Sequence, residues 1–366
     1  MKNTFGNSLA ITIFGESHGA YIGAVLDGLA PGIEISDEFI NEQLRLRRPA
    51  GKISTARQEQ DPYQIVSGAF EGKTTGTALT IIIPNSSQHS KDYSKTRPIA
   101  RPGHADYTAF CKYHGYEDYR GGGHFSGRIT AAVVAAGAIV IPALRKKGIY
   151  IGSHIKKLNG IEDRDFGEYM ADISKLNGMD FAVLDEDAAV AMKKAAEAAA
   201  ADGDSVGGVL ETAIVGMPAG IGEPWFDSIE SELAHAMFGI PAIKGIQFGA
   251  AFDMVDRCGS EYNDPFKMDG DTVITTTNNN GGINGGITNG MPITFRLAVK
   301  PTPSIYKPQQ SVNFMEGKDS ELQIEGRHDP AIIHRARVVV DSLAAIVMYD
   351  ALAARFGTDY FCPSGE

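Results

Sequence analysis

The sequence predicts an α+β fold built on antiparallel sheets. Strand-like segments follow one another in pairs, whereas the helix-like segments come in separate blocks. Strict alternation of strand and helix, which is typical of a doubly wound parallel sheet, is absent. No clean linker divides the chain, so residues 1–366 are predicted to form a single domain. A similar strand–strand–helix rhythm in the two halves indicates an internal duplication.

The predicted strands are runs of β-branched and apolar residues bounded by glycine, proline or asparagine. In chain order they cover residues 9–15, 22–28, 63–70, 77–84, 207–220, 245–252, 271–278 and 291–301. The first two strands flank a "GESHGA" turn. The stretch from 84 to 128 shows no such pattern and is rich in Ser, Asp, Arg, Gly and His. We predict that it is a long irregular segment, and such segments are usually functional.

Five helices are predicted from apolar periodicity and from start and stop signals. They cover residues 36–49, 127–146, 185–204, 227–238 and 332–356. Ser36 is the expected N-cap of the first, and its arginine-rich end suits the helix dipole. Asp227, with Glu230 three residues on, is a capping-box pattern. The apolar run at 129–144 is only 16 residues long and mostly Ala, Gly and Val, so it predicts a buried helix rather than a membrane span.

The overall composition excludes several function classes. At 43% apolar and 22% charged residues the chain is typical of a soluble globular protein. A net charge of −11 argues against nucleic-acid binding, although a local arginine cluster can still bind a phosphorylated small molecule. Three widely spaced cysteines and an N-terminus unlike a signal peptide predict a reducing cytoplasm. No grouping of His, Cys or Asp has metal-ligand spacing.

Two glycine-containing stretches look like nucleotide-binding loops but fail on spacing. In "RGGGHFSGR" (120–128) the last glycine of a G-x-G-x-x-G motif would fall on Ser126. Because the glycines lead into a predicted helix, whose first N–H groups are available, we expect an anion or ring-edge site here; the alternative is a loose surface loop. In "SGAFEGKTTG" (67–76) Ser67 stands where a P-loop needs glycine, which favours a Thr-rich turn between two strands.

Further candidate residues each have two interpretations. His18 in "GESHG" and His104 in "RPGHADYT" suit general acid catalysis near neutral pH, but either can be an ordinary loop histidine. Asp329 precedes Pro330 and the last helix, a position that is normally an N-cap. The run "RRPAGKISTAR" is either a solvated charged stretch or a site for a highly anionic substrate. Its cations are Arg47, Arg48, Lys52 and Arg57.

Taken together, these stretches resemble the chorismate synthase family. "FGESHG", "RRP", "RPGHADY", "DYRGGG", "GGINGG", "KPTPS" and "GRHDP" occur in the family's order and spacing over essentially the whole chain. The resemblance implies a β-α-β sandwich, with a central helical layer between two antiparallel sheets, and commonly a homotetramer. It also implies conversion of 5-enolpyruvylshikimate 3-phosphate to chorismate and phosphate, the last common step of aromatic amino acid biosynthesis.

The implied reaction is a redox-neutral anti-1,4-elimination that requires reduced FMN. An electron-rich flavin lends electron density while an allylic phosphate leaves, and it recovers that density when hydrogen is lost. The resemblance assigns His18 to protonation of the leaving phosphate, and His104 to protonation of the anionic reduced flavin. Asp329 is assigned as the base acting through flavin N5. Both histidines are expected to have a pKa near the working pH.

The resemblance also assigns the binding residues. For FMN it points to His124, Phe125, Ser126, Pro241, Ala242, Gly285, Lys300, Pro301, Thr302, Pro303, Ser304 and Arg327. For the substrate, which carries two carboxylates and a phosphate, it points to Arg47, Arg48, Arg128 and Arg335. Positions such as Arg47 and Lys52 are linked to NADPH in related enzymes, where NADPH is an indirect reductant and many members rely on an external flavin reductase.

One departure from the family pattern stands in the glycine loop. Many members have R-S-S-A-R after the glycines, whereas this chain has His124 and Phe125 in the first two places and keeps Arg128 in the last.

Two other function classes stay open. A flavin oxidoreductase with net turnover would consume reductant in proportion to product. A non-catalytic nucleotide-binding protein would depend on Lys73 of the near-miss P-loop.

Overall fold

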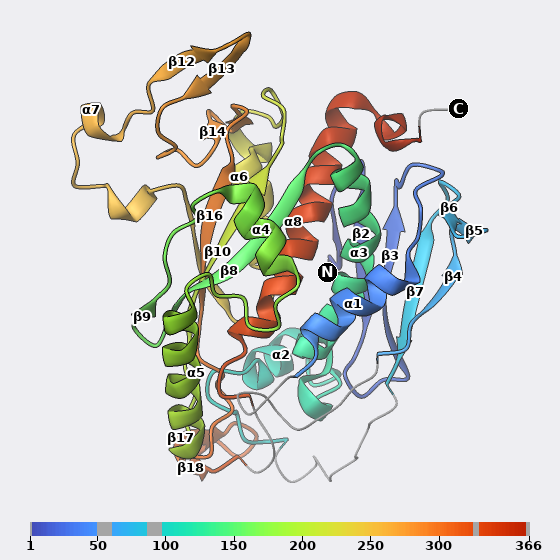
Figure 1. Ribbon diagram of the computed structural model, residues 1–366. Helices are drawn as coiled ribbons and strands as arrows, with labels where there is room; N and C mark the ends of the chain where they lie inside the picture. Colours follow the sequence, from blue (N-terminus) through green and yellow to red (C-terminus); the bar gives the residue numbers. More distant parts are fainter. Residues whose placement is uncertain (1, 50–60, 86–96, 325–328, 364–366) are drawn as a thin grey trace.

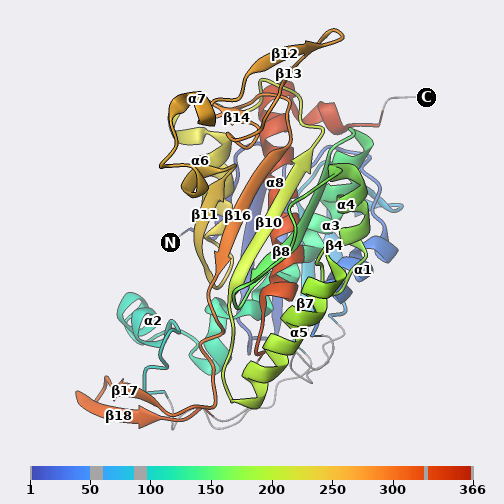
Figure 2. The same ribbon diagram turned by 60° about the vertical axis from the view of Figure 1, so that its left-hand side comes forward.

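A layer of helices lies between two five-stranded antiparallel sheets (Figure 1). The structure is a computed structural model and describes residues 2–49, 61–85, 97–324 and 329–363. The turned view in Figure 2 separates the second sheet from the helices behind it. The predicted α+β class with a central helical layer is confirmed.

The first sheet has the strand order β1-β2-β3-β7-β4. Its strands are β1 (Thr4–Phe5), β2 (Ala10–Gly15), β3 (Tyr21–Asp27), β4 (Gln64–Ser67) and β7 (Leu79–Pro84). Strand β7 shows the expected period of two, because Leu79, Ile81 and Ile83 are fully buried while the residues between them are not. The hairpin of β2 and β3 carries the "GESHG" turn at its tip.

The second sheet has the order β11-β16-β10-β8-β9. Its strands are β8 (Tyr150–Leu158), β9 (Ile161–Glu162), β10 (Gly208–Val215), β11 (Ile243–Phe248) and β16 (Ile293–Val299). Strand β8 was not predicted, because Ser153 and His154 break its apolar pattern. Both are fully buried, and their partners on other elements satisfy them: Thr212 for Ser153, and Asp163 for His154. Only tertiary structure supplies those partners.

The helical layer is built around α3 and α8. The helices of the fold are α1 (Asp37–Arg47), α2 (Asp106–Tyr113), α3 (Thr130–Lys146), α4 (Tyr169–Asn177), α5 (Glu186–Ala201), α6 (Ile229–Met237), α7 (Gly259–Tyr262) and α8 (Ile333–Phe356). Helix α3 packs on β3 and β7 of the first sheet, and α8 packs on β8 and β10 of the second. A Cβ built on Gly137 would lie 2.3 Å from Ser342 Cβ, so the two helices touch almost backbone to backbone.

The apolar segment of α3 is a core helix. Residues 127–146 form a helix that is long and apolar enough to cross a membrane, but 83% of its most apolar window is buried inside the protein. The prediction of a buried central helix is therefore confirmed.

Short strands and turns lie outside the two main sheets. They are β5 (Ala69–Phe70), β6 (Lys73–Thr74), β12 (Phe266–Asp269), β13 (Thr272–Thr275), β14 (Ile283–Asn284), β15 (Ile287–Thr288), β17 (Gln309–Asn313), β18 (Lys318–Leu322) and short 3₁₀ turns at Arg120–Phe125, Gly127–Ile129, Trp225–Asp227, Ala251–Asp253 and Thr358–Phe361. The β12–β13 hairpin projects from one end, and α2 with the β17–β18 hairpin projects from the other (Figure 2). Residues 67–76 hold the β5–β6 hairpin, so the Thr-rich turn is confirmed and the P-loop alternative is wrong.

The structure confirms one predicted helix cap and corrects several other local predictions. Ser36 caps α1 as expected, accepting from Phe39 N. The N-cap of α6 is Ser228, which accepts from Ser231 N at 3.1 Å, because Asp227 still belongs to the preceding 3₁₀ turn. Asp329 does not cap α8, whose N-cap position is Ile332 and has no side-chain cap. Helix α2 lies inside the stretch predicted to be irregular, and α4 was missed; neither has a side-chain cap that would mark its start.

The contact at Gly137 predicts a stability effect. Gly137→Ala should destabilise the protein by about 1–3 kcal/mol, although alanine is the better helix former, because the added methyl group collides with Ser342 on α8. Urea denaturation measures this. The control is Gly178→Ala at the end of α4, where an added Cβ meets nothing within 4 Å and the change should stay within about 0.5 kcal/mol. Equal stabilities of the two variants would contradict the prediction.

Candidate functional site

The glycine loop of residues 120–128 packs directly against the turn that carries His18. Ser17 N donates to Gly123 O at 3.1 Å, and Ser17 Oγ lies 3.1 Å from His18 Nδ1 and donates to Arg120 O. A Cβ on Gly121 would lie 2.2 Å from His18 Cε1. The glycines therefore position His18. Of the three, only Gly122 has open surroundings, its nearest neighbour being Ser126 Cβ at 3.8 Å.

The two residues that depart from the family pattern have separate roles in this loop. His124 Nδ1–H donates to Gly15 O at 2.7 Å, at the end of β2, so the ring ties the glycine loop to the His18 hairpin. Phe125 is 44% exposed, and its ring meets Tyr113 of α2 edge-on. Ser126 accepts from Arg128 N at 3.2 Å and starts the 3₁₀ turn that leads into α3. The helix thus begins where the sequence predicted.

Asp61 is the centre of an arginine cluster that sequence reasoning missed. Its side chain is fully buried and accepts from Arg47 Nη2 at 2.9 Å and from Arg128 Nη1, while Arg48 Nε lies 3.9 Å away. Burial alone would raise the pKa of Asp61, but Arg47 and Arg128 outweigh it and lower that pKa. Asp61 also has a left-handed backbone, with φ of 46°. Aspartate tolerates this conformation better than most residues do.

The cluster extends to the last helix. Arg335, in the first turn of α8, donates from Nε to Arg47 O at 2.8 Å and from Nη1 to Asp329. The four predicted substrate arginines are therefore adjacent, although they come from three separate parts of the chain. Among the described residues, this cluster brings four guanidinium groups together with two carboxylates, those of Asp61 and Asp329.

A second group forms around His104 and joins the "RPGHAD" loop to the "KPTPS" loop. His104 Nδ1–H donates to Pro102 O at 3.1 Å, so Nε2 accepts from Ser304 Oγ at 2.9 Å when the ring is neutral. Lys300 Nζ donates to Gly103 O at 2.7 Å. Burial, with a smaller effect of Arg101, lowers the pKa of His104 to about 4. The expected pKa near neutrality is therefore wrong for His104.

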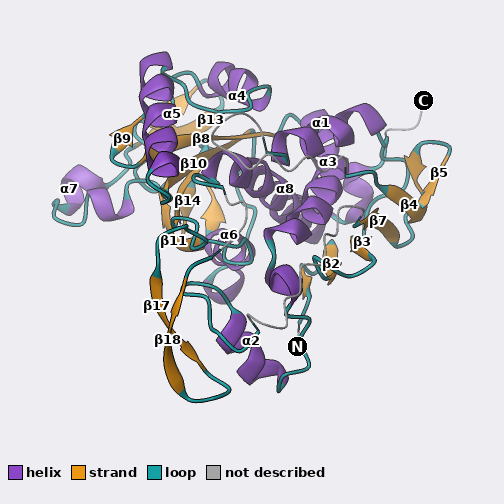
Figure 3. Ribbon diagram, turned by 90° about the horizontal axis from the view of Figure 1, so that it is seen from below, coloured by secondary structure: helices purple, strands orange, loops and turns teal. Residues whose placement is uncertain are grey.

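The two groups meet through residues 205 and 206. Ser205 Oγ donates to Thr302 O at 2.6 Å, and Val206 N donates to Pro330 O at 2.8 Å, next to Asp329. The Thr302 hydroxyl is buried without a hydrogen-bond partner in the described structure, as expected for an atom that a ligand satisfies. This end of the sandwich, with α2 and the β17–β18 hairpin, faces the viewer in Figure 3.

The other predicted binding residues divide into three sets. Ala242 O accepts from Lys300 N at 3.0 Å, which places Pro241 and Ala242 beside the "KPTPS" loop of residues 300–304. Gly285 lies in the β14–β15 turn, before β16, whereas Lys300 follows β16. The seven residues of that strand span on the order of 20 Å, so Gly285 is not brought to the site of its own chain. Lys52 and Arg327 lie outside the described residues.

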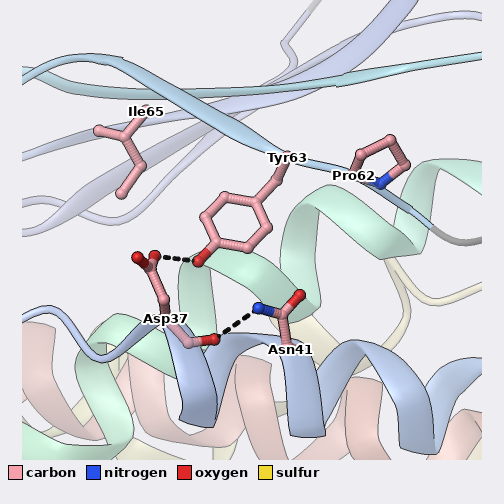
Figure 4. Close-up of a pocket in the computed structure, with 5 residues that line it drawn as sticks. All are labelled: Asp37, Asn41, Pro62, Tyr63 and Ile65. Atoms are coloured by element: carbon pink, nitrogen blue, oxygen red, sulfur yellow. Dashed lines mark hydrogen bonds between the residues drawn. The ribbon is translucent and has the colours of Figure 1, made fainter.

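One further pocket lies apart from these residues. It is open and is lined by Asp37, Asn41, Pro62, Tyr63 and Ile65, between the start of α1 and β4 (Figure 4). Tyr63 donates to the Asp37 carboxylate, and burial raises the pKa of Tyr63. The arginines lie at the opposite end of α1, so this pocket does not include them. Among the described residues, no group of three or more His, Cys, Asp or Glu side chains is arranged to hold a metal ion.

Comparison with known proteins gives a single, consistent family. A profile described as chorismate synthase matches residues 9–353. The chain is 45% identical over 350 residues to the chorismate synthase of Pyrococcus abyssi, covering 96% of this chain and 97% of that one. It is 44% identical over 363 residues to the chorismate synthase of Dehalococcoides mccartyi, covering 98% of each. A crystal structure of chorismate synthase superposes with a TM-score of 0.76 at 29% identity, covering 96% of this chain and 94% of that one.

The contact between Gly121 and His18 predicts the effect of a single methyl group. Gly121→Ala should displace the imidazole and lower stability by about 1–3 kcal/mol, because its Cβ would collide with the ring in a backbone of φ 57°. NMR signals of the His18 ring and urea denaturation measure the two effects. Gly72→Ala is the matched control, since Gly72 has φ of 73° and open space around it. It should show the backbone strain alone, and an unmoved His18 ring in Gly121→Ala would contradict the prediction.

Proposed function

Because the chain belongs to the chorismate synthase family, we propose that its arginine cluster binds 5-enolpyruvylshikimate 3-phosphate and that His18, His104 and Asp329 move the protons of the elimination. The chain is a chorismate synthase, a carbon–oxygen lyase of the shikimate pathway that removes phosphate. The observation that carries the residue-level proposal is the gathering of Arg47, Arg128 and Arg335 around Asp61 and Asp329, next to the His18 turn.

The arginine cluster suits the charge of the substrate. The substrate carries two carboxylates and a phosphate, and guanidinium groups bind such anions through paired, charge-assisted hydrogen bonds. Arg128 stands just before α3, and Arg335 lies in the first turn of α8. The positive ends of both helix dipoles therefore add to the electrostatic field of these side chains. We propose that Asp61 offsets the repulsion between the Arg47 and Arg128 guanidinium groups and holds them in a fixed arrangement before the substrate arrives.

We propose that His18 is the general acid for the leaving phosphate. Ser17 occupies the Nδ1 side of the ring, and the glycine loop limits its movement, so Nε2 is the atom that would deliver the proton. Asp329 is the proposed base, and its pairing with Arg335 fixes the orientation of the carboxylate. Proton transfer between well-placed groups contributes typically about 10²–10⁴-fold to a rate.

The loops around His104 and the glycine loop of residues 120–128 offer groups that fit reduced FMN. Lys300, the bare backbone at Gly122, the exposed ring of Phe125 and the unpartnered hydroxyl of Thr302 provide a cation, close approach, a stacking face and a polar contact. When bound, reduced FMN supplies electron density that assists loss of the allylic phosphate and is returned at the end. His104 would hold a proton at Nε2 only beside an anion, because burial otherwise keeps its ring neutral.

We propose that NADPH is only an indirect reductant, acting through an external flavin reductase. Arg47 is bonded to Asp61 in the cluster proposed to bind the substrate, so it is not assigned to NADPH as well. Reduction of FMN by NADPH with the purified protein alone would contradict this.

A cytoplasmic location is proposed because Cys111, Cys258 and Cys362 form no disulfide. Recovery of the protein outside the cytoplasm on cell fractionation would refute that location.

A homotetramer is also proposed. Gly285 and Lys300 lie at opposite ends of β16, so both can contact one FMN only if the glycine comes from another copy of the chain. Trp225 and Phe226, close to that end, are 84% and 87% exposed and provide apolar surface for such a contact. Light scattering should give four times the mass of one chain, and a stable monomer that retains activity would refute the proposal.

The proposed chemistry predicts redox-neutral turnover. Under anaerobic conditions with chemically reduced FMN, the protein should release chorismate and phosphate in equal amounts from 5-enolpyruvylshikimate 3-phosphate, without net loss of reduced flavin. Absorbance and a phosphate assay measure the products. Consumption of reductant in proportion to product would instead favour a flavin oxidoreductase.

The same assay tests the three proton-transfer residues. His18→Ala, His104→Ala and Asp329→Ala should each lower kcat by about 10²-fold or more, because each removes a group that moves a proton. His235→Ala is the control, since His235 is an exposed histidine on α6 outside the site. A variant with full activity would remove that residue from its proposed role.

A further inference from the structure

Asn85 connects the His18 turn to the arginine cluster through one amide group. It follows the last residue of β7, and its backbone N donates to Ala20 O at 3.1 Å. Its side-chain Nδ2 donates to Glu16 O at 3.0 Å and to Gly19 O at 2.9 Å, which are the two ends of the turn that holds His18. Its Oδ1 accepts from Arg128 Nε at 3.0 Å.

The chemistry of the partners fixes the orientation of this amide. Glu16 O and Gly19 O are carbonyl oxygens, which only accept hydrogen bonds, and the guanidinium of Arg128 only donates. A flipped amide would lose all three bonds and oppose like groups, so the oxygen and nitrogen positions are determined by the network. The amide therefore acts as a spacer of fixed length between a proposed proton donor and a proposed substrate clamp.

Asn85 adds little to what already holds the sheet together. Strands β3 and β7 are paired from Leu26 with Leu79 to Tyr21 with Pro84, and the side chain of Asn85 lies beyond the end of that ladder. Arg128 is anchored at its tip by Asp61 and by Pro84 O at 3.3 Å. The hydrogen bond from Arg128 Nε to Asn85 holds the guanidinium from a third direction and so fixes the rotation of its plane.

We propose that Asn85 is a positioning residue for the elimination, which sets the place of His18 relative to Arg128 and hence to the leaving phosphate. The inference rests on the proposed function, because it takes His18 as the acid and Arg128 as a substrate clamp. Misplacement by about 1 Å far from the reacting atoms can cost on the order of 10²-fold in rate. No role in direct contact with the substrate is assigned to Asn85.

The test is a double-mutant cycle on kcat. Asn85→Ala should lower kcat by about 10–100-fold in the wild-type background, but by less than about 3-fold in the His18→Ala background, because its effect passes through His18. Asn85→Asp keeps the shape and the acceptor but loses both donors to the turn, so it should not restore kcat. A purely structural role would give equal losses in both backgrounds, in step with a lower Tm, and would overturn the proposal.

A second readout does not depend on activity. The NMR signals of the His18 ring should shift in Asn85→Ala and stay in place in Asn41→Ala, a matched control. Asn41 is an exposed asparagine on α1 whose Nδ2 also donates to a carbonyl, Asp37 O at 2.8 Å. Unshifted His18 signals in Asn85→Ala would overturn the inference. If the wild type makes no chorismate, the proposed function fails by itself, and the ring signals still decide whether Asn85 positions His18.

Discussion

The close contact of α3 and α8 is the constraint on which the rest of the structure depends. Each sheet packs on one of these two helices, so the approach of their backbones at Gly137 and Ser342 sets the spacing of the whole sandwich. Gly137 lies about two turns into α3, and Ser342 lies about two and a half turns into α8. Arg128 before α3 and Arg335 in the first turn of α8 both contact the Arg47–Asp61 pair, so the helices run in parallel. Their N-termini therefore lie at the same end of the protein. Arg128 and Arg335 meet there because the helices meet, and the positive ends of two dipoles point the same way.

A second close approach builds the acid side of the site. The backbone of the glycine loop packs against the ring of His18. Hydrogen bonds of Ser17 and His124 join the loop to the His18 hairpin, and Asn85 donates to the same turn. The loop thus serves two purposes at once. Its packed glycines position the proposed acid, while the backbone at Gly122 has open space around it, where flavin contact is proposed. His124 at a position where relatives often have arginine is accounted for by its bond to Gly15 O, which an imidazole Nδ1 makes from within the loop.

Burial and neighbouring charges, rather than solvent, set the protonation states of Asp61 and His104. Asp61 is fully buried between arginines that lower its pKa, and His104 is held neutral by burial between two loops. An anion bound here would pair with the arginines and would favour protonation of His104. The groups that the proposed reaction needs are thus arranged before binding and respond electrostatically to it.

Local patterns along the chain predict the α+β class, most strands and helices, the buried α3 helix and the motifs that identify the family. These depend on local periodicity, on capping residues such as Ser36 and on spacing, all of which are written along the chain. The same patterns miss β8, because His154 is buried there against carboxylates from elsewhere in the fold. The N-cap alternative for Asp329 is wrong, and the chain gives no local signal for Asp61 or Asn85. Only the tertiary structure decided these, because the role of a buried polar side chain is set by partners that are distant in sequence.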